Sequence, residues 1–271
     1  MRYEAHRVDE IAINCVMTGL LSSPMTRQCK YLGRPCPNDR DMVMKKGEKM
    51  FLYYYMESQY VLESILKKRL KLSTMDSLND PYEMLPDFED HNGWRRPIDL
   101  VREDIQELVK NTGMICMSAT GSSPGMWGHY ADKHKGVAFE FKFENEEDEN
   151  EKRFKVIYSD KRVVVPAAEV LKNNKNARED FFKKMIKTKD VCWCCEQEYR
   201  WVFSLIAPDT FINKKGLYFR QLPKELTRVI LGVDCKINEG TIQKALDAMN
   251  LTDRVKVVRA KLCDTGFNIL V

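Results

Sequence analysis

From Met50 onward the sequence contains short strand-like segments and apolar helical stripes that follow one another in no regular order. The aromatic run over residues 51–55 favours a strand, and a stripe of apolar residues after Ser58, which we expect to cap it, predicts a helix. We predict further strands at 70–73, 113–118, 136–141, 154–158, 199–206, 226–233, 255–262 and 267–271, and helices at 97–109, 124–132, 167–189 and 239–249, the last capped by Asn238. Since no βαβ repeat is visible, the sequence predicts an α+β fold with a mixed central sheet and flanking helices.

The first 48 residues differ from the rest. A helix is predicted at 8–21, but Pro24, Gly33, Pro35 and Pro37 interrupt regular structure after it. We therefore expect an N-terminal extension over residues 1–48, to which the sequence assigns no role, and a main α+β domain over 49–271. The acidic run at 144–151 is predicted to form the tip of a hairpin that joins two strands of this domain.

The composition is that of an ordinary globular protein. A net charge of +4 in 271 residues is too small to imply nucleic-acid binding by itself. No apolar run approaches the roughly 18 residues needed to cross a bilayer, and the N-terminus has no signal-peptide core. We expect a cytoplasmic protein with no membrane partner.

The nine cysteines are odd in number and irregularly spaced, which is not typical of a secreted disulfide framework. Cys192, Cys194 and Cys195 are close together, but they lack the paired spacing of a structural zinc site. We expect packing thiols and no metal. A cysteine–histidine catalytic pair stays open, because nothing in the sequence selects one.

Three short segments carry polar chemistry that packing alone does not require. The first, at residues 79–83, reads Asn-Asp-Pro-Tyr-Glu and is a strong turn signal. A rigid turn satisfies Asn79 and Asp80 locally, but it is also a good platform from which Asp80 or Glu83 could reach a ligand hydroxyl or a metal. Both interpretations stay open, and they are compatible.

The second segment, at residues 126–130, reads Met-Trp-Gly-His-Tyr and follows a loop of small residues. Trp127 could simply close the core. Alternatively, Trp127, His129 and Tyr130 could line a surface suited to a flat group such as nicotinamide or adenine.

The third segment, at residues 196–200, reads Glu-Gln-Glu-Tyr-Arg. On an extended strand Glu196, Glu198 and Arg200 would share one face. A surface ion-pair ladder is one explanation, whereas a buried cluster of these three residues would be typical of a site with tuned pKa values. Phosphate-binding glycine loops and HExxH are absent from the sequence.

The same residues resemble domain-of-unknown-function family 2971 (DUF2971), a bacterial group. The shared features are the aromatic first strand at 53–55, the turn at 79–83, the 126–130 segment followed by His134-Lys135-Gly136, and the strand at 193–200. The resemblance extends from about Met50 to the C-terminus, and it implies no particular activity.

A second resemblance is to ADP-ribosyltransferases, in the order of an aromatic first strand, a helix, a second strand, a tyrosine-bearing helix and a late Glu-x-Glu. It implies cleavage of the nicotinamide–ribose bond of NAD. Glu198 would stabilise the oxocarbenium-like charge and Glu196 would assist, while Tyr54, Trp127 or Tyr130 would stack on nicotinamide.

The sequence therefore predicts one cleft and an NAD-dependent ADP-ribosyltransferase-like enzyme, a toxin or anti-phage effector whose acceptor is nucleic acid or protein. One alternative is a Mg²⁺-dependent nuclease or phosphohydrolase with four carboxylate ligands: Asp80, Glu83, Glu196 and Glu198. Another is a non-catalytic nucleotide sensor. The predicted catalytic residues are Glu198, Glu196 and Arg200, and the predicted cofactor-binding residues are Tyr54, Asn79, Asp80, Glu83, Trp127, His129 and Tyr130.

Overall fold

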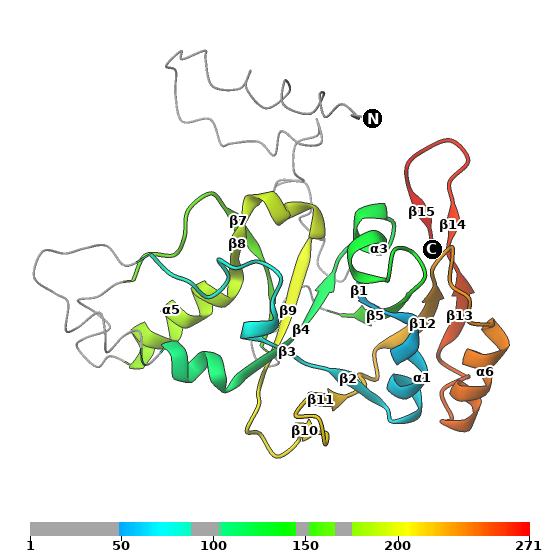
Figure 1. Ribbon diagram of the computed structural model, residues 1–271, viewed down its shortest axis with the longest axis horizontal. Helices are drawn as coiled ribbons and strands as arrows, with labels where there is room; N and C mark the ends of the chain where they lie inside the picture. The colour runs from blue at the N-terminus through cyan, green and yellow to red at the C-terminus, as the bar shows by residue number, and fades with distance from the viewer. Residues whose placement is uncertain (1–48, 88–102, 104, 145–151, 166–174) are drawn as a thin grey trace, which may run out of the picture. The chain divides into compact units, whose positions relative to one another are not determined.

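The computed structural model describes residues 49–87, 103, 105–144, 152–165 and 175–271. The predicted N-terminal extension with its helix at 8–21 lies outside the described residues, as do most of the predicted helix at 97–109 and the predicted acidic hairpin tip. The fold is α+β as predicted: a mixed central sheet with flanking helices (Figure 1). None of the described helices is long and apolar enough to cross a membrane.

Among the described residues, eight strands form the central sheet, in the order β13-β12-β5-β1-β4-β9-β6, with β3 paired to β4. Only β12 and β13 run parallel, and the other pairs are antiparallel. The strands of this sheet are β1 (Met50–Met56), β3 (Ser73–Thr74), β4 (Thr112–Ser118), β5 (Val137–Phe143), β6 (Arg153–Lys155), β9 (Glu198–Ser204), β12 (Leu226–Leu231) and β13 (Lys256–Arg259).

Smaller sheets and helices surround it. The small sheets contain β2 (Arg69–Lys71) with β10 (Phe211–Ile212) and β11 (Tyr218–Gln221), β7 (Ile157–Ser159) with β8 (Thr188–Asp190), and β14 (Lys261–Leu262) with β15 (Ile269–Leu270). The α-helices are α1 (Ser58–Leu66), α3 (Pro124–Tyr130), α5 (Lys175–Lys187) and α6 (Glu239–Ala248), and two 3-10 helices are η1 (Met75–Ser77) and η2 (Val191–Glu196). Residues 105–110 are also helical.

Helices cover both faces of the sheet, because side chains along each strand alternate between the two. On one face, Leu52 and Phe139 pack in the main core with Val61 of α1 and Leu246 of α6. On the opposite face, Tyr53, Tyr55, Ala138 and Ile230 pack against Met126 and Trp127 of α3. Met114 and Val202 continue that second face and contact Ile186 of α5. The candidate site lies on this second face, between α3 and α5.

The helix starts follow from local capping. The Asn238 side chain accepts a hydrogen bond from the Gly240 amide at 2.7 Å, which confirms the predicted cap of α6. Ser123 caps α3 in the same way, with Pro124 in the first turn. Ser58 was predicted to cap α1, but Glu57 occupies that position and no side chain caps the helix.

One predicted pairing is wrong. The segment after the acidic run does not return alongside β5, because β6 pairs with β9 at the other end of the sheet. Phe154 lies opposite Arg200, so β6 covers the flank of the strand that carries the late carboxylate. The described residues between 137 and 159 contain three strands, β5, β6 and β7, and β5 and β6 do not form the predicted hairpin.

The chain turns sharply between α3 and β5. Asp132, Lys133 and His134 are three consecutive non-glycine residues with positive φ, a conformation that is uncommon outside glycine. Gly136 follows, and a Cβ there would collide with the carbonyl oxygen of Met56. The His134-x-Gly136 motif therefore has a structural role, since it brings the end of α3 against β1.

Candidate functional site

The cleft opens where the central sheet splits. β1 pairs with β5 along its whole length, but it pairs with β4 at a single position, Tyr53 opposite Ser118. The two strands therefore diverge, and a cleft of about 630 Å³ lies between them, within the range of small-molecule sites. Its walls include Tyr53, Tyr54 and Tyr55 from β1 and Cys116 to Ser118 from β4.

The late acidic segment supplies two carboxylates to this cleft by an arrangement that differs from the prediction. Glu198 and Arg200 share one face of β9, as expected, but Glu196 ends the 3-10 helix η2 and is not part of the strand. Gln197 between them has φ 47° and ψ 52°, the left-handed conformation. This turn places Glu196 beside Glu198, and both line the cleft.

A lysine that the sequence analysis did not select lies at the centre of the cluster. Lys189 Nζ is 2.7 Å from Glu196 Oε2 and 3.0 Å from Glu198 Oε2. It also forms an ion pair with Glu83, at 3.2 Å from Oε1, although without hydrogen-bond geometry. The lysine side chain is 3 % exposed, and its Nζ lies 5.0 Å from the ring centroid of Trp193. Lys189 thus joins three carboxylates from two distant segments of the chain.

Arg200 binds two of these three carboxylates, Glu198 and Glu83. Its Nε donates to Glu198 Oε1 at 2.8 Å and its Nη2 to Glu198 Oε2 at 3.1 Å. Nη2 also donates to Glu83, and Nη1 donates to the Ile186 carbonyl at 2.8 Å. The arginine is completely buried and does not line the cleft. Its contacts make it a positioning residue for Glu198 and Glu83, in place of the predicted catalytic role.

The Tyr130 hydroxyl connects the turn at 79–83 to the acidic cluster. It donates a hydrogen bond to Glu196 Oε1 and accepts one from Asn79 Nδ2. Ser118 Oγ donates to the Glu196 carbonyl at 2.6 Å, and the Tyr158 hydroxyl accepts from the Glu198 amide at 2.8 Å. Side chains from distant segments therefore meet at one site, and Asn79, Glu83, Tyr130, Glu196 and Glu198 all line the cleft.

The charges of the cluster do not cancel. Three carboxylates, on Glu83, Glu196 and Glu198, face two cations, on Lys189 and Arg200, so one negative charge is in excess when all are ionised. Burial by itself would raise the pKa of Glu198, but Arg200 and Lys189 lower it to about 2. Burial raises the pKa of Glu83 above its ordinary value, even though Arg200 opposes the shift.

The neighbouring hydroxyl and thiol groups stay protonated. Burial, followed by the charge of Glu196, raises the pKa of Tyr130 well above its ordinary value. Burial and the charge of Glu198 likewise raise the pKa of the Cys116 thiol, which also lines the cleft. Since a nucleophilic cysteine needs a lowered pKa, the environment of Cys116 does not favour thiolate chemistry.

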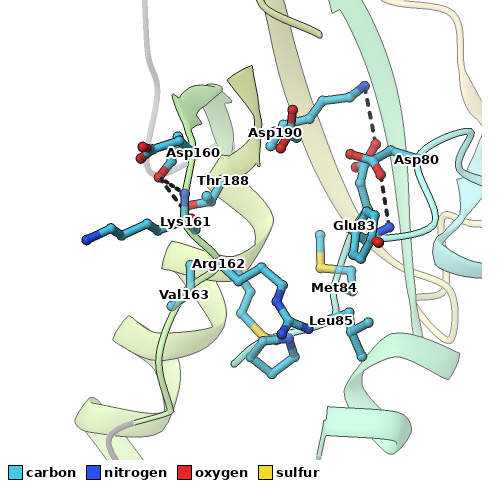
Figure 2. Close-up of a pocket in the computed structure, with 15 residues that line it drawn as sticks. Asp80, Glu83, Met84, Leu85, Asp160, Lys161, Arg162, Val163, Thr188 and Asp190 are labelled. Atoms are coloured by element: carbon cyan, nitrogen blue, oxygen red, sulfur yellow. Dashed lines mark hydrogen bonds and ion pairs between the residues drawn. The ribbon is translucent and has the colours of Figure 1, made fainter. Parts of the chain in front are cut away.

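Asp80 lies outside the cleft. Its Oδ1 accepts a hydrogen bond from the Tyr82 amide at 2.9 Å, so the predicted turn is confirmed. Asp80 lines a second, smaller cavity of about 220 Å³, which shares only Glu83 and Lys189 with the cleft. Figure 2 shows Asp80 beside Glu83 at one wall of this cavity, with Asp160 and Arg162 across from them.

Of the aromatic residues and the histidine predicted to line the cleft, one lies elsewhere. Trp127 is completely buried, its Nε1 donates to the Gly121 carbonyl at 2.8 Å, and its ring stands edge-on to Tyr55. It closes the core beneath α3, so the expectation that it lines the cleft is wrong. Tyr54 does line the cleft, where its hydroxyl donates to the Lys71 carbonyl at 3.3 Å, and His129 is exposed at the rim.

The three cysteines near Lys189 do not share one environment. Cys192 and Cys195 are exposed, whereas Cys194 is buried and disulfide-bonded, so the expectation of three packing thiols is wrong. Within the described residues, no group of three or more histidine, cysteine or acidic side chains has an arrangement that could hold a metal ion.

Residues 126–201 match DUF2971, described as proteins of unknown function. The match confirms the predicted resemblance over this segment, which supplies Tyr130, Lys189, Glu196, Glu198 and Arg200 to the site. The turn that carries Asn79 and Glu83, and the aromatic strand β1, lie outside the matched residues.

No curated protein and no solved structure significantly matches the chain. The description of DUF2971 names no activity, so a function can be inferred only from the chemistry of the site. It is notable that Lys189, the centre of the charge cluster, lies inside the segment. A lysine at the end of a predicted helix gives no sequence signal of burial, which explains why it was missed.

Proposed function

We propose that the protein is an NAD-dependent ADP-ribosyltransferase-like enzyme that cleaves the nicotinamide–ribose bond of NAD. The observation that carries the proposal is the excess negative charge of the buried cluster at the floor of a tyrosine-walled cleft. Breaking a bond between a ribose and a positively charged nicotinamide creates an oxocarbenium-like centre. Fixed negative charge in a site of low dielectric stabilises such a centre.

The role of Glu198 follows from its pKa. With a pKa of about 2 the carboxylate is ionised at any physiological pH, so it is suited to electrostatic stabilisation and not to proton transfer. Arg200 and Lys189 hold it in one position and reduce the reorganisation needed during the reaction. In this proposal Glu198 is the permanent anion of the site.

Glu196 and Tyr130 have the better geometry for contact with the sugar. Both line the cleft, and the tyrosine hydroxyl is oriented by Asn79 on one side and Glu196 on the other. Ribose hydroxyls need donors and acceptors at fixed positions, which this trio supplies. The tyrosines of β1 provide the aromatic wall against which nicotinamide would pack.

The Mg²⁺ alternative is less well supported by the donor set. A metal shared by Glu83, Glu196 and Glu198 would need the position that the Lys189 ammonium occupies among the three carboxylates. The lysine therefore blocks the one position from which a divalent cation could contact all three carboxylates. The cluster is therefore better suited to an organic cation in the cleft than to a metal within the carboxylates.

The experiment is to incubate the purified full-length chain with NAD and to measure nicotinamide release, with and without a chelator. The proposal predicts release that the chelator does not change. Glu198→Gln should lose this release, and Glu140→Gln is its matched control. Glu140 is a buried carboxylate on the same sheet face, but it pairs with Arg228 and does not line the cleft. Absence of NAD binding by calorimetry would contradict the proposal.

A further inference from the structure

The small sheet formed by β2, β11 and β10 has a basic and aromatic outer face. Figure 1 shows the three strands side by side, and their register places Phe211, Phe219 and Lys71 in one row across the sheet. Arg69 lies on the same face, two residues from Lys71, and its guanidinium stacks on the Phe219 ring at 3.7 Å. Leu70 and Tyr218 on the opposite face pack against the core; in the row, Phe211 and Lys71 are exposed, whereas Phe219 is buried beneath the Arg69 guanidinium.

The strands of this sheet and the segments next to them carry excess positive charge. Residues 67–71 and 214–220 contain seven cations and no acidic residue. Ion pairs with Glu63 and Asp209 occupy three of them: Lys67, Arg69 and Arg220. The other four cations have no carboxylate partner in the part of the chain that the structure describes: Lys68, Lys71, Lys214 and Lys215.

Aromatic surface is exposed on the same edge. Phe211 is 51 % exposed at the outermost strand. The chain then turns through Lys214 and Lys215, whose position is fixed because Asn213 Oδ1 accepts hydrogen bonds from the amides of Lys215 and Leu217 at 2.9 Å. Gly216 has φ 75°, which a tight turn of this kind requires. Lys214 and Lys215 therefore lie in an ordered turn shortly after the strand that carries the exposed Phe211.

The face is continuous with the cleft. Lys71 belongs to the row and also lines the cleft, and its carbonyl accepts the hydrogen bond from the Tyr54 hydroxyl. A ligand lying along the row would therefore reach the cleft mouth at Lys71.

We propose that the outer face of β2, β11 and β10 binds single-stranded nucleic acid. Unpaired lysines neutralise backbone phosphates, and an exposed aromatic ring offers a stacking surface to an unpaired base, as in binding surfaces for single strands. Charge complementarity identifies a polyanion, and the exposed Phe211 ring favours unstacked bases over a duplex. The inference concerns binding and stands without the proposed reaction on NAD.

The test is fluorescence anisotropy of labelled oligothymidine of about 20 nucleotides with the full-length chain, at several salt concentrations and without NAD. An oligouridine of equal length tests RNA, and a duplex and polyglutamate serve as competitors. The proposal predicts salt-dependent binding of at least one single-stranded oligomer, with weaker competition from the duplex and from polyglutamate. Equal competition by polyglutamate, or no binding at low salt, would overturn it.

Variants locate the surface. Lys214→Gln with Lys215→Gln should reduce the slope of log affinity against log salt by about 1.4, because each phosphate contact on a single strand contributes roughly 0.7. Phe211→Ala should weaken binding about tenfold through lost stacking. The matched control is Lys236→Gln with Lys244→Gln, two exposed lysines outside this sheet, which should bind like wild type. Equal losses in the control and the test variants would contradict the proposed location.

Discussion

The ammonium group of Lys189 lies 2.7 Å from Glu196 Oε2, and both side chains are almost completely buried. This contact joins β8, which follows α5, to the end of η2 before β9. The lysine brings further carboxylates to the same point, so one side chain holds together the acidic part of the cleft.

Lys189→Met should destabilise the fold by about 3–5 kcal/mol, because it leaves carboxylates buried without their shared cation. Chemical denaturation at pH 7 measures the free energy of unfolding. Lys67→Met is the control, since Lys67 pairs with Glu63 at the surface and should cost less than about 1 kcal/mol. Similar losses for the two variants would show that Lys189 contributes no more than a surface ion pair.

Acid should weaken the fold through Glu198. Folding lowers the pKa of Glu198 from its ordinary value of 4.5 to about 2, so its contribution to stability is complete above about pH 4.5 and is lost as the pH falls towards 2. The full contribution is about 3 kcal/mol. Glu83 acts in the opposite direction: its raised pKa means that its ionisation disfavours the folded state as the pH rises above its ordinary value.

The measurement is the free energy of unfolding of wild type and Glu198→Gln between pH 7 and pH 3. The difference between the two proteins should shrink as the pH falls, because the variant lacks the titrating group while Glu83 is common to both. A difference that stays constant over this range would mean that the pKa of Glu198 is not lowered by folding.

Trp127→Phe should reduce stability and leave ligand binding unchanged. The substitution removes the hydrogen bond to the Gly121 carbonyl and part of the packing against Tyr55, at a cost of roughly 1–3 kcal/mol. Thermal unfolding and NAD titration should be measured on the same preparation. A loss of NAD affinity at unchanged stability would show that Trp127 contacts the ligand and would contradict this prediction.

Gly136→Ala should be strongly destabilising, by more than about 2 kcal/mol, because the backbone of β1 leaves no room for a methyl group at this position. Gly125→Ala is the matched control, since a Cβ there would meet only the Ser123 side chain, at 3.6 Å. Equal melting temperatures of the two variants would contradict the close approach of Gly136 to β1.

Parts of this structure could be predicted from sequence because the signals are local. The strand β1 is an uninterrupted run of apolar and aromatic residues, β4 and β5 are mostly apolar, and α6 has an apolar stripe with an asparagine cap. The alternation along β9 correctly placed Glu198 and Arg200 on one face. Each of these depends on neighbours within a few residues.

The remaining features depend on contacts between distant segments. Nothing in residues 153–155 indicates that β6 pairs with β9 and not with β5, because strand order is decided by packing of the whole sheet. Burial of Lys189 and of Trp127 likewise depends on segments far away in the chain. The sequence identified the residue types of the site, but the fold determined which of them line the cleft.

The central claim is that Glu198 stabilises positive charge that develops during cleavage of NAD. The most direct measurement compares NAD affinity, by calorimetry, with single-turnover nicotinamide release for wild type and Glu198→Gln. The account predicts that release falls by orders of magnitude while affinity changes only modestly, because the interaction strengthens mainly in the transition state. Nicotinamide release by a folded Glu198→Gln protein at the wild-type rate would contradict it.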